Sequence, residues 1–288
     1  MSTAIAISPL QWVGGKFAAA RRIVATFPLA SAYGTYVEVF GGAAHVLFCK
    51  PPGKQVEVFN DLNGDLVNFW MMARDHSQEL QERVDSLPYS RRLFEDYRAS
   101  LECAEPMDTI ERAARWFYVH RSTFGGSPDH RSWAYNIDHG GHNQAHSLRS
   151  ATALLSVTAG RLRDVQIECQ DFARIIQVYE RPQTLFYVDP PYVGCEDYYE
   201  VDGVPLFTEE QHRQLATLLN ATPALVALSY YEHPLIYELY PPSRWRRITW
   251  TQTKAVEKTR KARQYGREIL LMNYPKTYGL WQNCEGFI

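Results

Sequence analysis

The sequence has few cysteines and no pair of them at the Cys-x-x-Cys spacing. Its five cysteines form an odd, scattered set among 288 residues. Such a set excludes a disulfide framework and a structural zinc site, and it is typical of free thiols in a reducing compartment. The sequence also lacks a basic amino-terminal region followed by a long apolar stretch, so we expect no secretory signal and a cytoplasmic protein.

Long apolar runs and an excess of charge are also missing. No run of 18 apolar residues occurs, which argues against a membrane-spanning helix. Thirty basic residues against thirty-two acidic ones give a net charge of −2, so any footprint for nucleic acid has to be local. Two nucleotide motifs are absent as well. Without G-x-G-x-x-G, hydride chemistry is disfavoured, and without G-x-x-x-x-G-K-[ST], phosphate-loop chemistry is excluded.

Short apolar runs alternate with segments of helical spacing. This alternation predicts an α/β fold with three layers. We expect buried strands of a parallel sheet at 36–40, 56–59 and 184–188, with similar runs at 224–229 and 268–273, and helices at 17–27, 62–74 and 208–220. Between about 75 and 165 the rhythm breaks into helical, charged segments and a Gly/Ser/His/Asn-rich stretch. We therefore predict a main domain at 1–74 and 166–288, with a smaller helical insertion at 75–165.

Two glycines follow the first predicted strand, at the edge of the sheet where ligands bind in such folds. Phe40, Gly41 and Gly42 form this turn, and Asp61 comes twenty residues after Gly41 at the end of the next strand. The spacing suits a carboxylate that accepts hydrogen bonds from the ribose of an adenosine-containing cofactor. A tight turn and a helix cap are an equally consistent interpretation. Upstream, Lys16 on a Gly-Gly turn can reach a carboxylate or phosphate, unless it is simply a surface lysine at a helix entry.

The most informative string is Asp189-Pro190-Pro191-Tyr192, which leaves the apolar run at 184–188. Two prolines hold a stiff, extended turn and leave their carbonyls free to accept hydrogen bonds. The Asp189 carboxylate and the Pro190 carbonyl can each accept one N–H of an exocyclic amine and thereby expose its lone pair. Tyr192 offers a flat face on which a nucleobase can stack. We predict that these four residues are catalytic.

In these motifs and their order the sequence resembles the Dam-like, D12 class DNA adenine-N6 methyltransferases. The resemblance covers most of the chain: Trp12 to Lys16, the glycine turn, 60–63, 171–172, 189–192 and 268–274. It implies a Rossmann-like methyltransferase fold with a mixed, mostly parallel sheet, helices on both faces and a target-recognition insertion. It also implies S-adenosyl-L-methionine as cofactor, held by a set of residues: Trp12, Lys16, Phe40, Gly41, Gly42, Asp61, Asp171, Phe172 and Asp189.

Some positions depart from the family pattern. Ala43, Ala44 and His45 stand where the family has a large aromatic residue and further glycines, and the stretch from Arg121 to Gly126 matches its insertion only in part. These differences bear on the recognition sequence more than on the chemistry.

An adenine inside a duplex is inaccessible to a pocket, so the resemblance implies that the base is flipped out of double-stranded DNA. We expect phosphate contacts from a basic segment with interleaved aromatic residues at 244–267, and base contacts from the insertion. The predicted DNA-binding residues are Arg121, Arg131, Lys258, Arg260, Lys261 and Arg263. A monomer or weak dimer is expected. His139, His142 and His146 have metal-like spacing but lie in a glycine-rich stretch, so no metal site is predicted.

Several alternatives differ in substrate or in activity. A cytosine-C5 enzyme needs a nucleophilic cysteine, usually after proline, and no cysteine here follows proline. An N4-cytosine enzyme, an RNA amino-methyltransferase or a glutamine-amide methyltransferase would use the same amine chemistry. A non-catalytic DNA-binding protein on the same scaffold is the alternative of a different class. If the chain is half of a restriction–modification pair, the nuclease is a separate chain.

Overall fold

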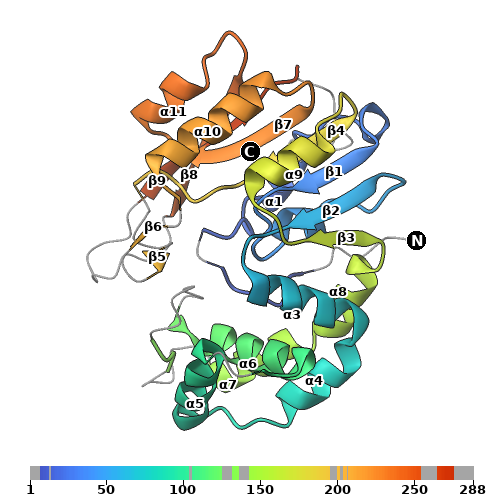
Figure 1. Cartoon of the computed structure of the whole chain (residues 1–288), viewed down its shortest axis with the longest axis vertical. Helices are drawn as coiled ribbons and strands as arrows, with labels where there is room; N and C mark the ends of the chain where they lie inside the picture. The colour runs from blue at the N-terminus through green and yellow to red at the C-terminus, as the bar shows by residue number, and fades with distance from the viewer. Residues whose placement is uncertain are drawn as a thin grey trace.

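The computed structural model describes residues 7–12, 14–103, 106–124, 132–135, 143–194, 200–201, 204–205, 207–253 and 265–275. Its centre is a seven-stranded sheet in the order β3-β2-β1-β4-β7-β9-β8 (Figure 1). Five strands run parallel: β1 Thr35–Glu38, β2 Val56–Asn60, β3 Val165–Glu168, β4 Thr184–Val188 and β7 Leu225–Tyr231. The predicted mixed, mostly parallel α/β sheet is therefore confirmed.

One strand near an edge of the sheet runs against the others. β9 Tyr265–Met272 pairs antiparallel with β7, and the edge strand β8 Arg246–Thr253 pairs antiparallel with β9, so β8 runs in the same direction as β7. The segment at 268–273 is thus a buried strand as predicted, but its direction is opposite to that of the parallel strands. β3 and β8 were not predicted, because both carry polar residues at positions where the buried strands carry apolar ones.

Helices cover both faces of the sheet, and alternate strand residues supply the two cores. On β1, Tyr36 belongs to one core and Val37 to the other, as the two-residue period of a strand requires. One face packs against α1 Ala20–Val24, α2 His45–Cys49 and α3 Gly64–Asp75. The other packs against α9 Phe172–Tyr179, α10 Glu209–Ala221 and α11 Pro234–Leu239 (Figure 1). These layers confirm the predicted three-layer arrangement.

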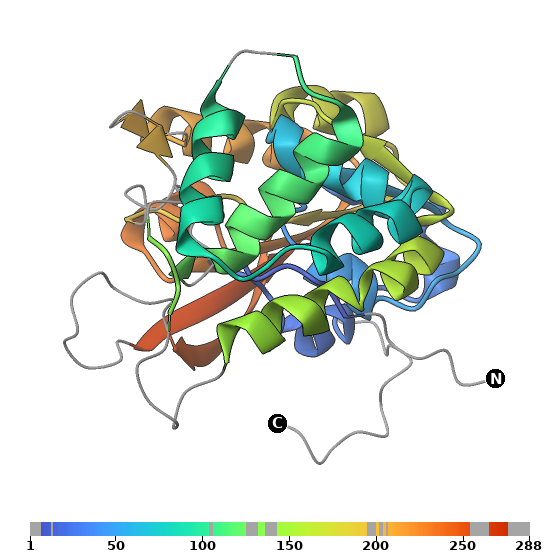
Figure 2. The same ribbon diagram turned by 90° about the horizontal axis from the view of Figure 1, so that it is seen from below.

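The helices between 75 and 165 gather next to α3, on the side where β3 forms the edge of the sheet (Figure 1), and Figure 2 shows the same group from below. They are α4 Ser77–Asp85, α5 Arg91–Glu102, α6 Thr109–Ser122, α7 Gln144–Thr152 and α8 Leu155–Leu162. Three are capped by side chains, because Ser90 accepts a hydrogen bond from the Leu93 N–H, Asp108 from the Glu111 N–H and Asn143 from the His146 N–H. Within the part of the chain that is described, the helices of this region are joined by short connections, and a single bridge pairs Thr123 with Trp133. The predicted domain limits themselves stay a prediction.

The sheet has a topological switch point between β1 and β4. From β1 the chain proceeds outward to β2 and β3, and it then returns to β4 on the other side of β1. In open α/β sheets, ligands bind beyond the carboxyl ends of the strands at such a point. The glycine turn after β1 and Asp189 after β4 both lie there.

None of the helices in the described residues has the length and the apolar composition that a membrane-spanning segment needs. A two-stranded ribbon, β5 Glu200–Val201 with β6 Val204–Pro205, follows β4.

Candidate active site

Asp189 and Tyr192 leave β4 at the switch point and remain in contact with each other. β4 is buried along its whole length, which fixes the direction in which the chain leaves the sheet. The Tyr192 hydroxyl lies 3.0 Å from Oδ1 of Asp189 and 3.0 Å from Oε1 of Glu268. Glu268 belongs to β9, two strands away from β4 in the sheet. The predicted catalytic turn therefore meets a carboxylate that the sequence reasoning did not include.

Lys16 completes this group, which we call the lysine cluster: Lys16, Asp189, Tyr192 and Glu268. Its ammonium group lies 2.9 Å from Oδ2 of Asp189 and 3.5 Å from Oε1 of Glu268. It also donates to the Gly14 carbonyl at 2.7 Å and lies 4.9 Å from the centre of the Tyr192 ring. The side chain of Lys16 is only 5% exposed. Lys16 thus reaches a carboxylate inside the site and is not a surface lysine.

Burial and mutual contact shift the pKa values in the cluster. Burial raises the pKa of Asp189 above its ordinary value, although Lys16 and the Tyr192 hydroxyl oppose this effect. The pKa of Glu268 is likewise raised by burial, with Lys16 again opposing. Desolvation alone would lower the pKa of Lys16, but Asp189 and Glu268 raise it above its ordinary value. Lys16 is therefore a permanent cation held between two carboxyl groups that retain protons more readily than usual.

Asp61 joins the ends of the first two strands at the glycine turn. Its Oδ2 accepts from the Gly42 N–H and its Oδ1 from the Asn63 N–H, both at 2.9 Å. Burial raises the pKa of Asp61, and these backbone donors, together with the backbone N–H of Leu62, oppose the shift. An ionised carboxylate has about four acceptor positions, so the Asp61 carboxylate can accept a further hydrogen bond beside its backbone donors. The side chain is partly exposed and available to a ligand.

Gly41 and Gly42 each occupy a position that is unfavourable for a residue with a side chain, for different structural reasons. A Cβ added to Gly41 would lie 2.1 Å from Cε2 of Phe59, whose ring packs directly on the turn. Gly42 has a φ of +48°, in the left-handed region that favours glycine, and a Cβ there would lie 3.0 Å from the indole nitrogen of Trp12. Trp12 therefore covers the turn that follows β1. The Gly42 carbonyl accepts from the indole N–H of Trp70, which anchors the turn from below.

A second wall of this edge comes from α9. Asp171 caps that helix by accepting from the Ala173 N–H, and its side chain is exposed. Phe172 stacks on Phe40 with 5.8 Å between ring centres, and Phe207 packs edge-on against Phe40. The predicted cofactor residues Phe40, Asp171 and Phe172 are thus brought together. Phe207, which closes this aromatic group, was not predicted.

Asn60 and Glu268 are the two further residues that sequence reasoning missed. The Asn60 amide donates to the Val39 and Gln170 carbonyls and accepts from the Gln170 N–H, so it ties together the segments that follow β1, β2 and β3. Its position directly before Asp61 was a usable signal. Glu268 had another signal, because a glutamate that begins an apolar strand run is costly to bury without partners.

Of the predicted DNA-binding residues, the structure describes Arg121 alone. Arg121 is buried on α6, and its guanidinium donates to the carbonyl and hydroxyl oxygens of Ser147. Desolvation lowers the pKa of Arg121 to about 10. In this structure Arg121 therefore binds the two helices together inside the insertion. The other predicted contacts, Arg131, Lys258, Arg260, Lys261 and Arg263, lie outside the described residues.

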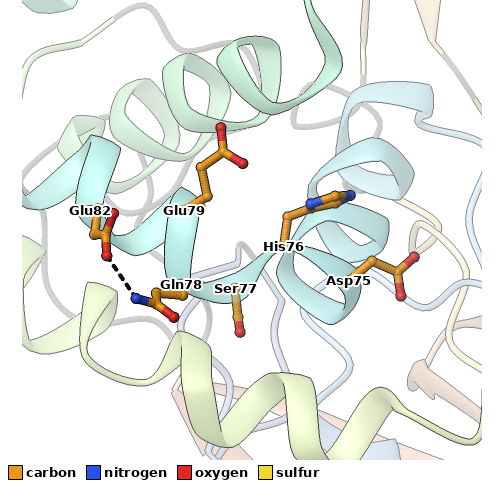
Figure 3. A pocket seen from close by; sticks show the side chains of 6 residues that line it. All are labelled: Asp75, His76, Ser77, Gln78, Glu79 and Glu82. Atoms are coloured by element: carbon orange, nitrogen blue, oxygen red, sulfur yellow. Dashed lines mark hydrogen bonds between the residues drawn. The ribbon is translucent and has the colours of Figure 1, made fainter.

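A depression of about 330 Å³ lies far from this site in the sequence, where α3 meets α4 (Figure 3). Asp75, His76, Glu79 and Glu82 line it, and Gln78 donates to Glu82. None of the predicted site residues belongs to it. Across the ranges that are described, no group of three or more His, Cys, Asp or Glu side chains is placed to hold a metal ion. His146 lies on α7, while His139 and His142 fall outside those ranges.

The fold and this site define the class of the protein. A seven-stranded, mostly parallel sheet, a glycine turn after β1 and Asp-Pro-Pro-Tyr at the switch point make it an α/β protein with a Rossmann-like methyltransferase fold. The sequence model of a protein family, the D12 class N6 adenine-specific DNA methyltransferases, matches residues 12–256 of the chain. The chain belongs to that family, which confirms the resemblance found in the sequence.

Two relatives from different sources are similar to the chain. A DNA N-6-adenine-methyltransferase of Escherichia phage P1 is 28% identical over 255 residues, which are 83% of this chain. This chain spans about a third of that relative's length, because the match covers 32% of it. The Type II methyltransferase M1.LlaDCHI of Lactococcus lactis subsp. cremoris is 24% identical over 278 residues. That match covers 92% of this chain and 94% of the relative.

Proposed function

We propose that this chain is a site-specific DNA methyltransferase that transfers a methyl group from S-adenosyl-L-methionine to N6 of a flipped-out adenine in duplex DNA. The observation that carries the proposal is the placement of Asp189, Tyr192 and Lys16 in one buried cluster beside the glycine turn of a D12 family member. Transfer is direct, without a covalent enzyme intermediate.

Asp189 and Pro190 bind the amine to be methylated. The Asp189 carboxylate accepts one N–H and the Pro190 carbonyl accepts the other, which draws the nitrogen lone pair out of conjugation with the ring. Lys16 at 2.9 Å opposes the effect of burial on the Asp189 carboxyl and so favours the ionised form, which can accept. Pro190 has no N–H and Pro191 restricts its backbone, so the carbonyl is held in position.

Tyr192 supplies a stacking surface for the extruded base. Unstacking a base costs a few kcal/mol, and stacking on an aromatic ring returns about 1–3 kcal/mol per base. The ring is fixed on two sides, because its hydroxyl contacts two carboxyl groups and the Tyr231 ring packs against it with 4.7 Å between ring centres. A base that enters the site thus meets a ring that cannot rotate away.

The residues at the glycine turn fit S-adenosyl-L-methionine, which supplies an electrophilic methyl group when bound. Asp61 is partly exposed beside the turn, and its carboxylate can accept from the ribose in addition to its backbone donors. The exposed Asp171 can accept from the adenine amino group, and the Phe40–Phe172 stack offers an apolar wall beside it. Trp12 closes the turn from the other side.

The natural setting that we infer is a bacterial or phage cytoplasm, with the chain acting as a monomer or weak dimer on double-stranded DNA. The lactococcal relative carries the name of a Type II methyltransferase, which favours a restriction–modification pair whose endonuclease is a separate chain. The alternatives are an N4-cytosine enzyme, an RNA amino-methyltransferase and a non-catalytic DNA-binding protein. Asp189 in place of the serine more usual in N4-cytosine enzymes favours adenine.

Transfer of a tritiated methyl group to plasmid DNA tests the proposal. Wild-type protein is expected to label DNA, and Asp189→Ala is expected to label none while its affinity for DNA stays within about threefold, because phosphate contacts dominate that affinity. Lys16 keeps Glu268 as a partner in this variant, so the fold is expected to survive. Equal labelling by both proteins would refute the assignment, and labelling by neither with intact DNA binding would favour the binding-only alternative.

A further inference from the structure

Two oxygen–oxygen contacts in the lysine cluster share one hydroxyl hydrogen. The Tyr192 hydroxyl lies 3.0 Å from a carboxyl oxygen of Asp189 and 3.0 Å from one of Glu268. A phenol has one hydrogen and can donate only one of these hydrogen bonds. If both carboxyl groups were ionised, the other contact would set two lone pairs against each other. A second proton, on Asp189 or Glu268, turns both contacts into hydrogen bonds.

Glu268 is a poor place for a full negative charge. Glu268 is only 1% exposed. Among the described residues, its second carboxyl oxygen, Oε2, has no hydrogen-bond partner. A buried ionised carboxylate with a bare oxygen is costly, whereas a protonated carboxyl tolerates an unpaired carbonyl oxygen far better. Lys16 is 3.5 Å from Oε1 and is shared with Asp189.

The charges of the cluster also indicate that the two carboxyl groups hold one proton. One ammonium and two carboxylates leave a net charge of −1 in a buried site, and one bound proton brings it to zero. Other titratable groups face the cluster: Tyr187, Tyr230, His45 and Glu38. Burial raises the pKa of both tyrosines, and it lowers the pKa of His45 to about 4, so these three are neutral near neutral pH.

Glu38 is the remaining acid near the cluster. Burial raises its pKa to about 8, so it too carries a proton through much of the neutral range. It has partners of its own, however, because it accepts from the Tyr36 hydroxyl at 2.8 Å. No hydrogen bond joins it to the described members of the lysine cluster. Glu38 therefore serves as a matched control for Glu268.

We propose that Asp189 and Glu268, joined through the Tyr192 hydroxyl, hold one shared proton when no cofactor is bound, and that Glu268 is a positioning residue that takes part in proton transfer through Tyr192. The proposal rests on the proposed function in one respect, because it takes the cofactor's sulfonium to be the positive charge that enters the site. The sulfonium then replaces the proton as the charge that balances the two carboxylates.

Methyl transfer restores the shared proton to Asp189 and Glu268. As the amine nitrogen bonds to the methyl carbon, the carbon–sulfur bond breaks and its electron pair stays on sulfur, so one positive charge leaves sulfur. The methylated amine gives one proton to Asp189. Tyr192 can pass its own hydrogen to Glu268 while it receives that proton, so the pair ends with one proton and the phenol is unchanged. Charge and atoms balance, with the site neutral before and after transfer.

Calorimetric titration tests this coupling without measuring turnover. Binding heats for S-adenosyl-L-methionine and for the uncharged thioether S-adenosylhomocysteine are compared in buffers with different ionisation enthalpies near neutral pH, which gives the protons released per binding event. In the wild type, the sulfonium ligand is expected to release about one proton more than the thioether. In Glu268→Gln this difference is expected to disappear, whereas in Glu38→Gln it is expected to remain.

Several results would overturn the proposal. They are equal proton release for the two ligands in the wild type, a difference that persists in Glu268→Gln, or a difference that Glu38→Gln abolishes. A failure of either ligand to bind would instead show that the proposed function is wrong, and this proposal with it. If Glu268→Gln does not fold, infrared difference spectra of the wild type decide. The band of a protonated carboxyl must be lost with the sulfonium and kept with the thioether, and the opposite result refutes the proposal.

Discussion

Replacing Lys16 with methionine would test the electrostatics of the site most severely. Methionine keeps much of the length of the side chain but removes the ammonium that lies 2.9 Å from Asp189 and 3.5 Å from Glu268. Both carboxyl groups then remain buried without a cation. We expect the free energy of unfolding to fall, and to fall more at high pH than at low pH.

The sign of the pH dependence follows from the direction of the pKa shifts. Asp189 and Glu268 both have folded pKa values raised above their ordinary values of 3.8 and 4.5. The folded state then binds more protons than the unfolded state, so stability falls as the pH rises above the ordinary values. Lys16 opposes this fall in the wild type, and its removal raises both pKa values further and widens the pH range of the loss.

The size of the effect can be bounded. Breaking a buried ion pair costs about 3–5 kcal/mol, but a carboxyl group escapes part of this cost by binding a proton, at about 1.4 kcal/mol per pH unit above its pKa. We therefore expect a loss of about 3 kcal/mol near pH 8 and about 1 kcal/mol near pH 5. Urea unfolding of wild type and variant at both pH values measures it.

Arg83→Met is the matched control. Arg83 also contacts two carboxylates, Glu79 and Glu111, but its side chain is 38% exposed. An exposed pair contributes about 0–1 kcal/mol, so this variant should lose little stability and show little pH dependence. If Lys16→Met lost the same free energy at both pH values, or no more than the control, the account of the cluster would be wrong.

Two other predictions concern the glycine turn and the acid that follows β2. Asp61→Ala is expected to weaken binding of S-adenosyl-L-methionine at least tenfold, because it removes both the ribose acceptors and the contact to the Gly42 N–H; unchanged affinity in calorimetry would show that Asp61 only caps the turn. Gly41→Ala is expected to destabilise by about 1–3 kcal/mol through overpacking against Phe59, whereas Ala44→Gly should stabilise by up to about 1 kcal/mol, because Ala44 has a φ of +55°. Thermal unfolding of both variants checks this contrast, and a loss of stability in Ala44→Gly would contradict it.

Much of the fold was predictable because its signals are local. The buried strands at the centre of the sheet read as continuous apolar runs, and Thr208 with Gln211 forms the capping box that begins α10. β3 and β8 lie at the two edges of the sheet, where one side faces solvent and the apolar signal is diluted. The direction of β9 depends on its hairpin with β8, and no local pattern encodes it.

The residues of the candidate site likewise divide into those that local sequence predicts and those that depend on the tertiary structure. Residues within one motif, such as Asp189 and Tyr192, could be found because the chemistry of an amine needs those groups at that spacing. Glu268 could not be assigned, because β9 must first be placed two strands from β4 before its carboxyl group meets Tyr192. Arg121 shows the opposite limit, since an arginine on a helix is exposed or buried according to tertiary packing that its own sequence does not reveal.

The identity of the methylated base distinguishes the proposed adenine-N6 activity from its alternatives. Plasmid DNA is incubated with the protein and isotopically labelled S-adenosyl-L-methionine, digested to nucleosides and analysed by mass spectrometry. We expect the label in N6-methyladenine, and we expect Asp189→Ala, which removes the side-chain acceptor for the amine, to abolish it. Label in N4-methylcytosine, or undiminished label in the variant, would contradict the assignment.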